Sequence, residues 1–151
     1  MSPEIRYYDT MRWGEDPLNS LSENDSHVSY LSHLAWIICG YREISGNHKY
    51  DKLLTNLCET MNRRILNSSS MNLATYPGES IYVPDMLVAI VALNQYADTH
   101  KDKYRSTVKQ WVTKAQKDWL DEETGLLASF IDKNGSLYER EFDIRIRPKK
   151  M

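Results

Sequence analysis

Apolar residues recur at the spacing of an α-helix in four stretches of the chain, and polar residues separate these stretches. In the second stretch the apolar positions share one side of a helix: Leu54, Leu57, Met61 and Ile65. The pattern predicts four helices, at residues 27–45, 49–66, 84–97 and 102–120. No sustained period runs through residues 1–25, so that segment is expected to be irregular.

The ends of the predicted helices carry residues suited to those places. Asp25 and Ser26 can cap the first helix, because their side-chain oxygens accept hydrogen bonds from the free N–H groups of the first turn. Gly46 and Asn47 can end it, because both tolerate the left-handed conformation. Pro84 suits the first position of the third helix, where an N–H group would have no partner in any case.

Two segments between the helices predict extended structure. Residues 72–82 look extended around a Pro-Gly turn. Residues 126–131 and 136–142 have the pattern of a β-hairpin, joined by a turn at residues 132–135. The predicted fold class is therefore mainly all-α, built of αα-hairpins with short β-hairpin loops.

The two halves of the chain match each other in sequence. With a shift of 53 residues, the apolar run at 37–39 falls on the run at 90–92. With a shift of 54 residues, LATY at 73–76 falls on LASF at 127–130, outside the helices, where shared helical periodicity does not explain the match. A chance likeness between amphipathic helices is the alternative to a true repeat. The repeat divides the chain into an irregular segment at 1–25, two αα-hairpin repeats within 26–142, at 26–79 and 80–142, and a basic tail at 143–151.

The predicted helices alternate in character. The first and third contain near-continuous apolar runs, at 34–39 and 86–93, and a helix that is apolar all round must be buried on most sides. The second and fourth have one apolar stripe and a charged opposite face. A stack of hairpins satisfies both patterns when the first and third helices are inner and the others outer, as in arrays that curve into an arc or ring.

The loops of the repeat carry two motifs: YPGESIYVPD at 76–85 leads into an inner helix, and DEETGL at 121–126 follows an outer helix. With these motifs the unit resembles the α/α-toroid, six-hairpin-glycosidase-like superfamily, and within it the linalool dehydratase/isomerase-like branch. The likeness covers about residues 25–140. Only two hairpins are present, so apolar inner-helix surface is left uncovered. Either missing hairpins complete the ring, or copies of the chain associate.

In the resembled superfamily, substrates bind at the end of the ring where inner helices begin. The resemblance therefore implies a site at the loop before the third helix. It implies that the carboxylates of Asp85 and Glu79 act as catalytic acid/base groups. It also implies that Tyr76 and Tyr82 bind the substrate by stacking on a sugar ring. His27, at the start of the first helix, is a further candidate for the site because imidazole titrates near neutrality.

Each of these residues also has a purely structural interpretation. Asp85 can stabilise the start of its helix, Glu79 can be a solvated turn residue, and both tyrosines can pack. A histidine at a helix start is commonly a surface or packing residue. His27 and His33 are six residues apart, so they lack the spacing of a zinc-binding pair. No metal site and no cofactor are predicted.

Charge excludes several kinds of partner. The 151 residues include 19 Lys and Arg and 21 Asp and Glu, a formal net charge of -2, which gives no general attraction to nucleic acid or to an anionic membrane. The basic tail at 143–151 is interpreted as solvated.

Cys39 and Cys58 lie in apolar helical stretches without a CxxC pair, so a disulfide framework is not expected.

No segment has the pattern of a membrane span or a signal peptide. The longest apolar run, at 86–93, is too short to cross a bilayer. The first ten residues lack the apolar core of a signal peptide. The protein is therefore expected to be soluble, and to be cytoplasmic if Met1 is its natural start.

These observations leave the function open between two main hypotheses. In the first, the chain is part of an α/α-toroid enzyme that acts on a carbohydrate or another small hydroxylated substrate, by glycoside cleavage or by a lyase or hydratase step. In the second, it is a non-catalytic helical-repeat scaffold or binding module that associates through its apolar inner helices. A truncated gene product without activity is a third interpretation. The expected partners are a small-molecule or carbohydrate ligand and further hairpins or copies of the chain.

Overall fold

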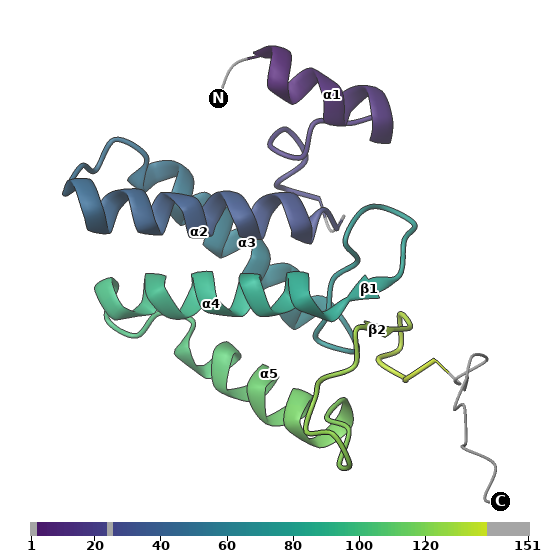
Figure 1. The fold of residues 1–151 in the computed structure, drawn as a ribbon. Coiled ribbons are helices and arrows are strands. Elements are labelled where there is room, and N and C mark those ends of the chain that lie inside the picture. The colour runs from purple at the N-terminus through teal and green to yellow at the C-terminus, as the bar shows by residue number, and fades with distance from the viewer. Residues whose placement is uncertain (1–2, 24–25, 139–151) are drawn as a thin grey trace, which may run out of the picture.

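The computed structural model describes residues 3–23 and 26–138. This part of the chain contains five helices and two short strands (Figure 1): α1 (Pro3–Trp13), α2 (Val28–Ser45), α3 (Asp51–Asn67), β1 (Ile81–Tyr82), α4 (Val83–Thr99), α5 (Arg105–Asp118) and β2 (Phe130–Ile131). The mainly all-α fold class is therefore confirmed. Helices α2 to α5 correspond to the four helices that the apolar pattern predicts.

Helices α2 and α4 lie side by side and form the most extensively packed pair (Figure 1). Helix α3 lies behind them in this view and contacts both, and α5 packs on α4. Consecutive helices thus form two hairpins, α2–α3 and α4–α5, with α2 and α4 adjacent. None of the described helices combines the length and the apolar character that crossing a lipid bilayer requires.

The core forms where the apolar sides of these helices meet. Buried aliphatic side chains fill its centre, and two tryptophans of the second hairpin close one end; Trp111 and Trp119 are each 1% exposed. The indole N–H of Trp111 donates to the side-chain oxygen of Asn72 at 2.9 Å, and that of Trp119 donates to the carbonyl of Gly135 at 2.8 Å. Each buried indole therefore fixes a loop as well as filling space.

Strand β2 pairs antiparallel with β1, a partner that the predicted β-hairpin around the turn at 132–135 did not include. Ile81 lies opposite Ile131, and both are buried, whereas Leu137 is joined only by an isolated bridge and stays 53% exposed. Ile131 therefore takes part in two pairings, with Ile81 of β1 and with Leu137 across the turn at 132–135. The rest of the predicted second strand, and the basic tail, lie outside the described residues.

The expectation of an irregular N-terminal segment is wrong, because α1 forms within it. Proline stands at its first residue and Glu4 lies in its first turn, both favourable at a helix start. Three of its large side chains are exposed, Tyr7 at 62%, Tyr8 at 66% and Met11 at 67%, whereas Trp13 at its C-terminal end is partly buried. A helix without one apolar side gives no period in the sequence, so the pattern could not reveal it.

Helix α2 begins without the predicted side-chain cap. The residue at the cap position is His27, which has a left-handed backbone with φ 62° and makes no capping hydrogen bond. Ser26 is therefore not the cap, and Asp25 lies outside the described residues. At the other end Gly46 has φ 64° and its N–H donates to the carbonyl of Arg42 at 2.9 Å, as predicted for a glycine that ends a helix.

Candidate functional site

A hollow of about 540 Å³ lies at the loop that leads into β1 and α4. We call it the α4 hollow; six residues line it: Thr75, Gly78, Glu79, Ser80, Tyr82 and Phe130. Its volume lies in the usual range for small-ligand sites, about 300–1,000 Å³. The hollow lies at the loop before α4, where the resemblance to the α/α-toroid superfamily implied a site.

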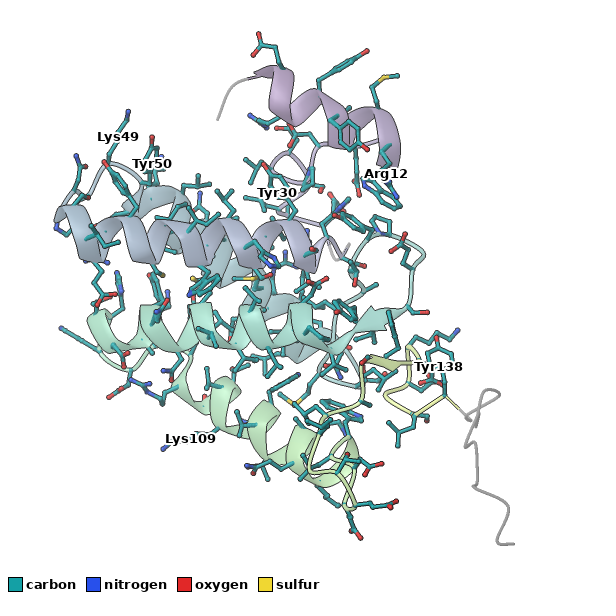
Figure 2. The ribbon with its side chains drawn as sticks, in the orientation of Figure 1. Arg12, Tyr30, Lys49, Tyr50, Lys109 and Tyr138 are labelled. Atoms are coloured by element: carbon teal, nitrogen blue, oxygen red, sulfur yellow. The ribbon has the colours of Figure 1, made fainter. Side chains whose placement is uncertain are left out.

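The walls of the α4 hollow combine aromatic rings with polar groups. The rings of Tyr82 and Phe130 are 4.9 Å apart, held together by the pairing of β1 with β2. The hydroxyl of Thr75 is buried and has no hydrogen-bond partner among the described residues. Ser80 lies 2.8 Å from the hydroxyl of Tyr138, the residue labelled near the end of the coloured ribbon in Figure 2. The carboxylate of Glu79 is exposed.

Asp85 lies outside this group. It is in the first turn of α4, is 6% exposed, and does not line the α4 hollow. A carboxylate in the first turn stabilises a helix through the positive end of its dipole. The structure therefore brings Glu79 and Tyr82 to one hollow and leaves Asp85 in the neighbouring helix start.

Tyr76 is covered by a residue of the N-terminal segment. The indole ring of Trp13 stacks on it, with ring centroids 4.3 Å apart and an angle of 8° between the planes. One face of the tyrosine is thus occupied in this structure. The residue that instead provides a ring to the α4 hollow is Phe130, which falls on Tyr76 when the two repeats are aligned. That alignment was the signal by which the sequence could have identified Phe130.

His27 is fully buried rather than placed in an open loop. Its Nε2 lies 2.5 Å from a carboxylate oxygen of Glu15, and its Nδ1 is buried without a partner among the described residues. The imidazole also meets the edge of Tyr76, with ring centroids 6.2 Å apart. Trp13 and Glu15 therefore hold the N-terminal segment against Tyr76 and His27, two of the predicted binding residues. No sequence pattern points to Trp13 or Glu15 as their partners.

The DEETGL motif forms a tight turn. The Oδ1 atom of Asp121 accepts hydrogen bonds from the backbone N–H groups of Glu123 and Thr124, at 3.0 and 2.8 Å, and from the hydroxyl of Thr124 at 3.0 Å. Gly125 follows with φ 69°, a conformation that suits glycine. The motif is thus accounted for by the geometry of a turn.

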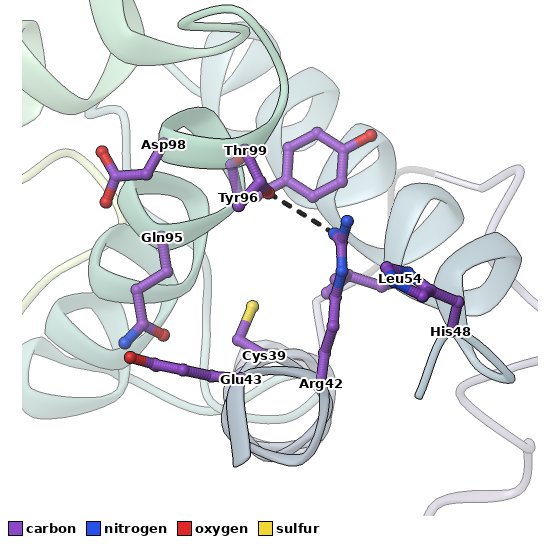
Figure 3. Close-up of a pocket in the computed structure, with 9 residues that line it drawn as sticks. All are labelled: Cys39, Arg42, Glu43, His48, Leu54, Gln95, Tyr96, Asp98 and Thr99. Carbon is purple, nitrogen blue, oxygen red and sulfur yellow. Dashed lines mark hydrogen bonds between the residues drawn. The ribbon is translucent and has the colours of Figure 1, made fainter. Parts of the chain in front are cut away.

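A second hollow, of about 450 Å³, lies between the C-terminal ends of α2 and α4 (Figure 3). We call it the C-terminal cleft. Cys39 points into it from α2, and burial raises the pKa of this thiol. Burial raises the pKa of Cys58 more strongly still. Both cysteines are therefore neutral thiols at neutral pH. The described residues contain no group of three His, Cys, Asp or Glu side chains that could hold a metal ion.

The comparisons with known proteins give no family for this chain. No protein-family model matches it. Neither the curated proteins nor the solved structures contain a significant match.

Proposed function

We propose that the chain is the ligand-binding part of an α/α-toroid-like enzyme that acts on a carbohydrate or another small hydroxylated compound. The observation that carries the proposal is the convergence of Thr75, Glu79 and Tyr82 on one hollow at the start of α4. A hydroxyl-rich ligand suits these groups. Its hydroxyls donate to the carboxylate and to the unpartnered threonine oxygen, and the aromatic rings cover its apolar C–H face.

The hollow supports binding more directly than it supports a complete catalytic site. Glycoside hydrolysis commonly uses two carboxylates on either side of the scissile bond. The α4 hollow offers one, Glu79, because Asp85 lies outside it. In the proposed enzyme Glu79 serves as one acid/base group, and the opposite wall belongs to further hairpins or to another copy of the chain. Glycoside cleavage and a lyase or hydratase step both remain compatible with this role.

Titration of the ¹⁵N-labelled full chain with methyl glucoside tests the proposal. We expect saturable shifts of the backbone amides that line the α4 hollow. Glu79→Gln should weaken binding about tenfold, because a hydrogen bond to a charged group is lost. Tyr82→Leu, which keeps apolar bulk but removes the ring, should weaken it as well. The matched control is Glu122→Gln, an exposed carboxylate outside the hollow. Unchanged spectra, or equal weakening by the control, would rule out the site.

A second candidate function is association through the apolar helices. Helix α2 exposes Ile37 at 64% and Ile44 at 90%, and α4 exposes Leu87 at 38% and Val91 at 44%. Exposed large aliphatic side chains at helical spacing are typical of a surface that meets a partner. The mass of the chain in solution distinguishes a self-associating module from a monomer.

A further inference from the structure

The C-terminal cleft presents an apolar floor and a polar rim. Cys39 lies on the α2 side, and Leu54 and Tyr96 also line the cleft (Figure 3). Leu54 and Tyr96 are almost fully buried. The rim is formed by Glu43 from α2 and Gln95 from α4, which lie on the same side of the cleft. The floor can therefore receive a short carbon chain, and the rim can receive a polar head.

The rim carries hydrogen-bond acceptors that are not in use. The amide oxygen of Gln95 is buried and has no partner within the described part of the chain. The carboxylate of Glu43 is exposed. Asp98, the other carboxylate at the cleft, is held by Arg105 at 2.6 Å. This oxygen has almost no accessible surface, so a ligand reaches it only when the partly exposed Gln95 side chain turns toward the cleft. A buried acceptor without a donor is unfavourable, so a ligand that then donates a hydrogen bond to it gains free energy.

The electrostatic setting of the rim favours a positive head. Helices α2 and α4 both end at the cleft, and the C-terminal end of a helix carries partial negative charge. Arg42 also lines the cleft, where it donates to the hydroxyl of Thr99 at 3.4 Å, and its charge is offset by Asp51, whose carboxylate oxygen lies 3.6 Å from its Nε. Among the described residues, Glu43 has no such cation beside its carboxylate.

We propose that the C-terminal cleft binds a protonated primary amine on a short aliphatic stem. The ammonium group donates hydrogen bonds to the amide oxygen of Gln95 and to the carboxylate of Glu43, and the stem lies over the apolar floor. This site is separate from the α4 hollow, which lies at the opposite end of α4. The two sites can therefore be tested independently.

The test is an NMR titration of the ¹⁵N-labelled full chain with n-butylammonium chloride, with n-butanol as a neutral ligand of matched shape. We expect saturable shifts of the amides around Cys39 and Gln95 with the amine and much smaller shifts with the alcohol. Glu43→Gln should weaken amine binding about tenfold, because a charge-assisted hydrogen bond is lost. Gln95→Leu should weaken it too. The matched control, Glu59→Gln, removes an exposed charge from α3 outside the cleft and should leave binding unchanged.

Three results would overturn the proposal. Equal shifts with n-butanol would show an apolar cavity that does not select for charge. Equal weakening by Glu59→Gln would show a general effect of net charge. No saturable shift at millimolar amine would show that the cleft does not bind this class of ligand. Far-UV circular dichroism of each variant separates loss of binding from loss of fold.

Discussion

Arg64 lies on the buried side of α3, three residues after Met61 and seven after Leu57, where the helical period places apolar side chains. It is only 2% exposed. Its guanidinium donates to three backbone carbonyls of the segment before α2, those of Ser20 at 2.7 Å, Glu23 at 3.0 Å and Ser26 at 2.6 Å. Arg63 donates to the carbonyls of Leu21 and Glu23 in the same segment, so the two arginines together fix its path by satisfying carbonyl groups.

Replacing this side chain should destabilise the fold. In Arg64→Met the apolar volume is largely kept, but the carbonyls of Ser20 and Ser26 lose a charged donor, while that of Glu23 keeps the one from Arg63, so we expect the free energy of unfolding to fall by about 3 kcal/mol. Urea denaturation followed by tryptophan fluorescence measures the change. The matched control is Lys52→Met, an exposed residue of the same helix, for which we expect less than about 0.5 kcal/mol. If Arg64→Met lowers the free energy of unfolding no more than the control does, the buried guanidinium does not stabilise the segment before α2.

The candidate site residues show how far single positions could be predicted. Glu79 and Tyr82, two residues that the resemblance implied for a site, line one hollow at the start of α4, whereas whether they bind a ligand stays a prediction. The surroundings of Tyr76 and His27 could not be predicted, because their partners Trp13 and Glu15 come from a segment without a periodic pattern. Contacts between distant segments depend on how the chain packs, and local spacing does not contain that information.

At the scale of elements, the four long helices follow from the apolar period and their ends follow within three residues. The turn at 132–135 and its bridge from Ile131 to Leu137 follow the predicted hairpin, but the pairing of β2 with β1 was not predicted. Residues 130–131 have the same alternation whichever strand they meet, so the pattern does not reveal that Ile131 is buried beside Ile81. Periodicity therefore predicts which segments form regular structure better than it predicts their neighbours.

Helix α1 is attached to the rest of the molecule mainly near its C-terminal end. It lies apart from the layers formed by α2 to α5 (Figure 1), and Trp13 anchors it by stacking on Tyr76. Trp13→Ala removes this stack, which is worth about 0.5–1.5 kcal/mol. We expect tryptic cleavage after Arg12 to become several-fold faster, while the midpoint of thermal unfolding of the rest changes little.

The control for this prediction is Tyr8→Ala, which removes an aromatic ring from the same helix. Tyr8 is 66% exposed, so its loss should leave the cleavage rate after Arg12 unchanged. Limited proteolysis followed by mass spectrometry gives both rates. If the two variants are cleaved equally fast, the stack on Tyr76 does not hold α1 in place.

At the scale of the whole molecule, the two hairpins bury one side of α2 and α4 and leave apolar residues on the other. Ile37 and Ile44 are seven residues apart and lie on one side of α2, and Leu87 and Val91 are four apart on one side of α4. A larger array of hairpins would cover such stripes with neighbouring helices. In this structure these stripes are exposed to solvent.

This surface predicts self-association of the isolated chain. Burying an isoleucine contributes about 1.5–3 kcal/mol, so Ile44→Lys should raise the dissociation constant at least about tenfold. Ile37→Lys should act in the same direction. Leu66→Lys is the matched control, because Leu66 is 52% exposed on α3, in the other layer. Sedimentation equilibrium over a range of concentrations gives the dissociation constant of the wild-type chain and of the three variants. A wild-type chain that stays monomeric throughout would exclude association through these helices, and an equal effect of Leu66→Lys would place the interface elsewhere.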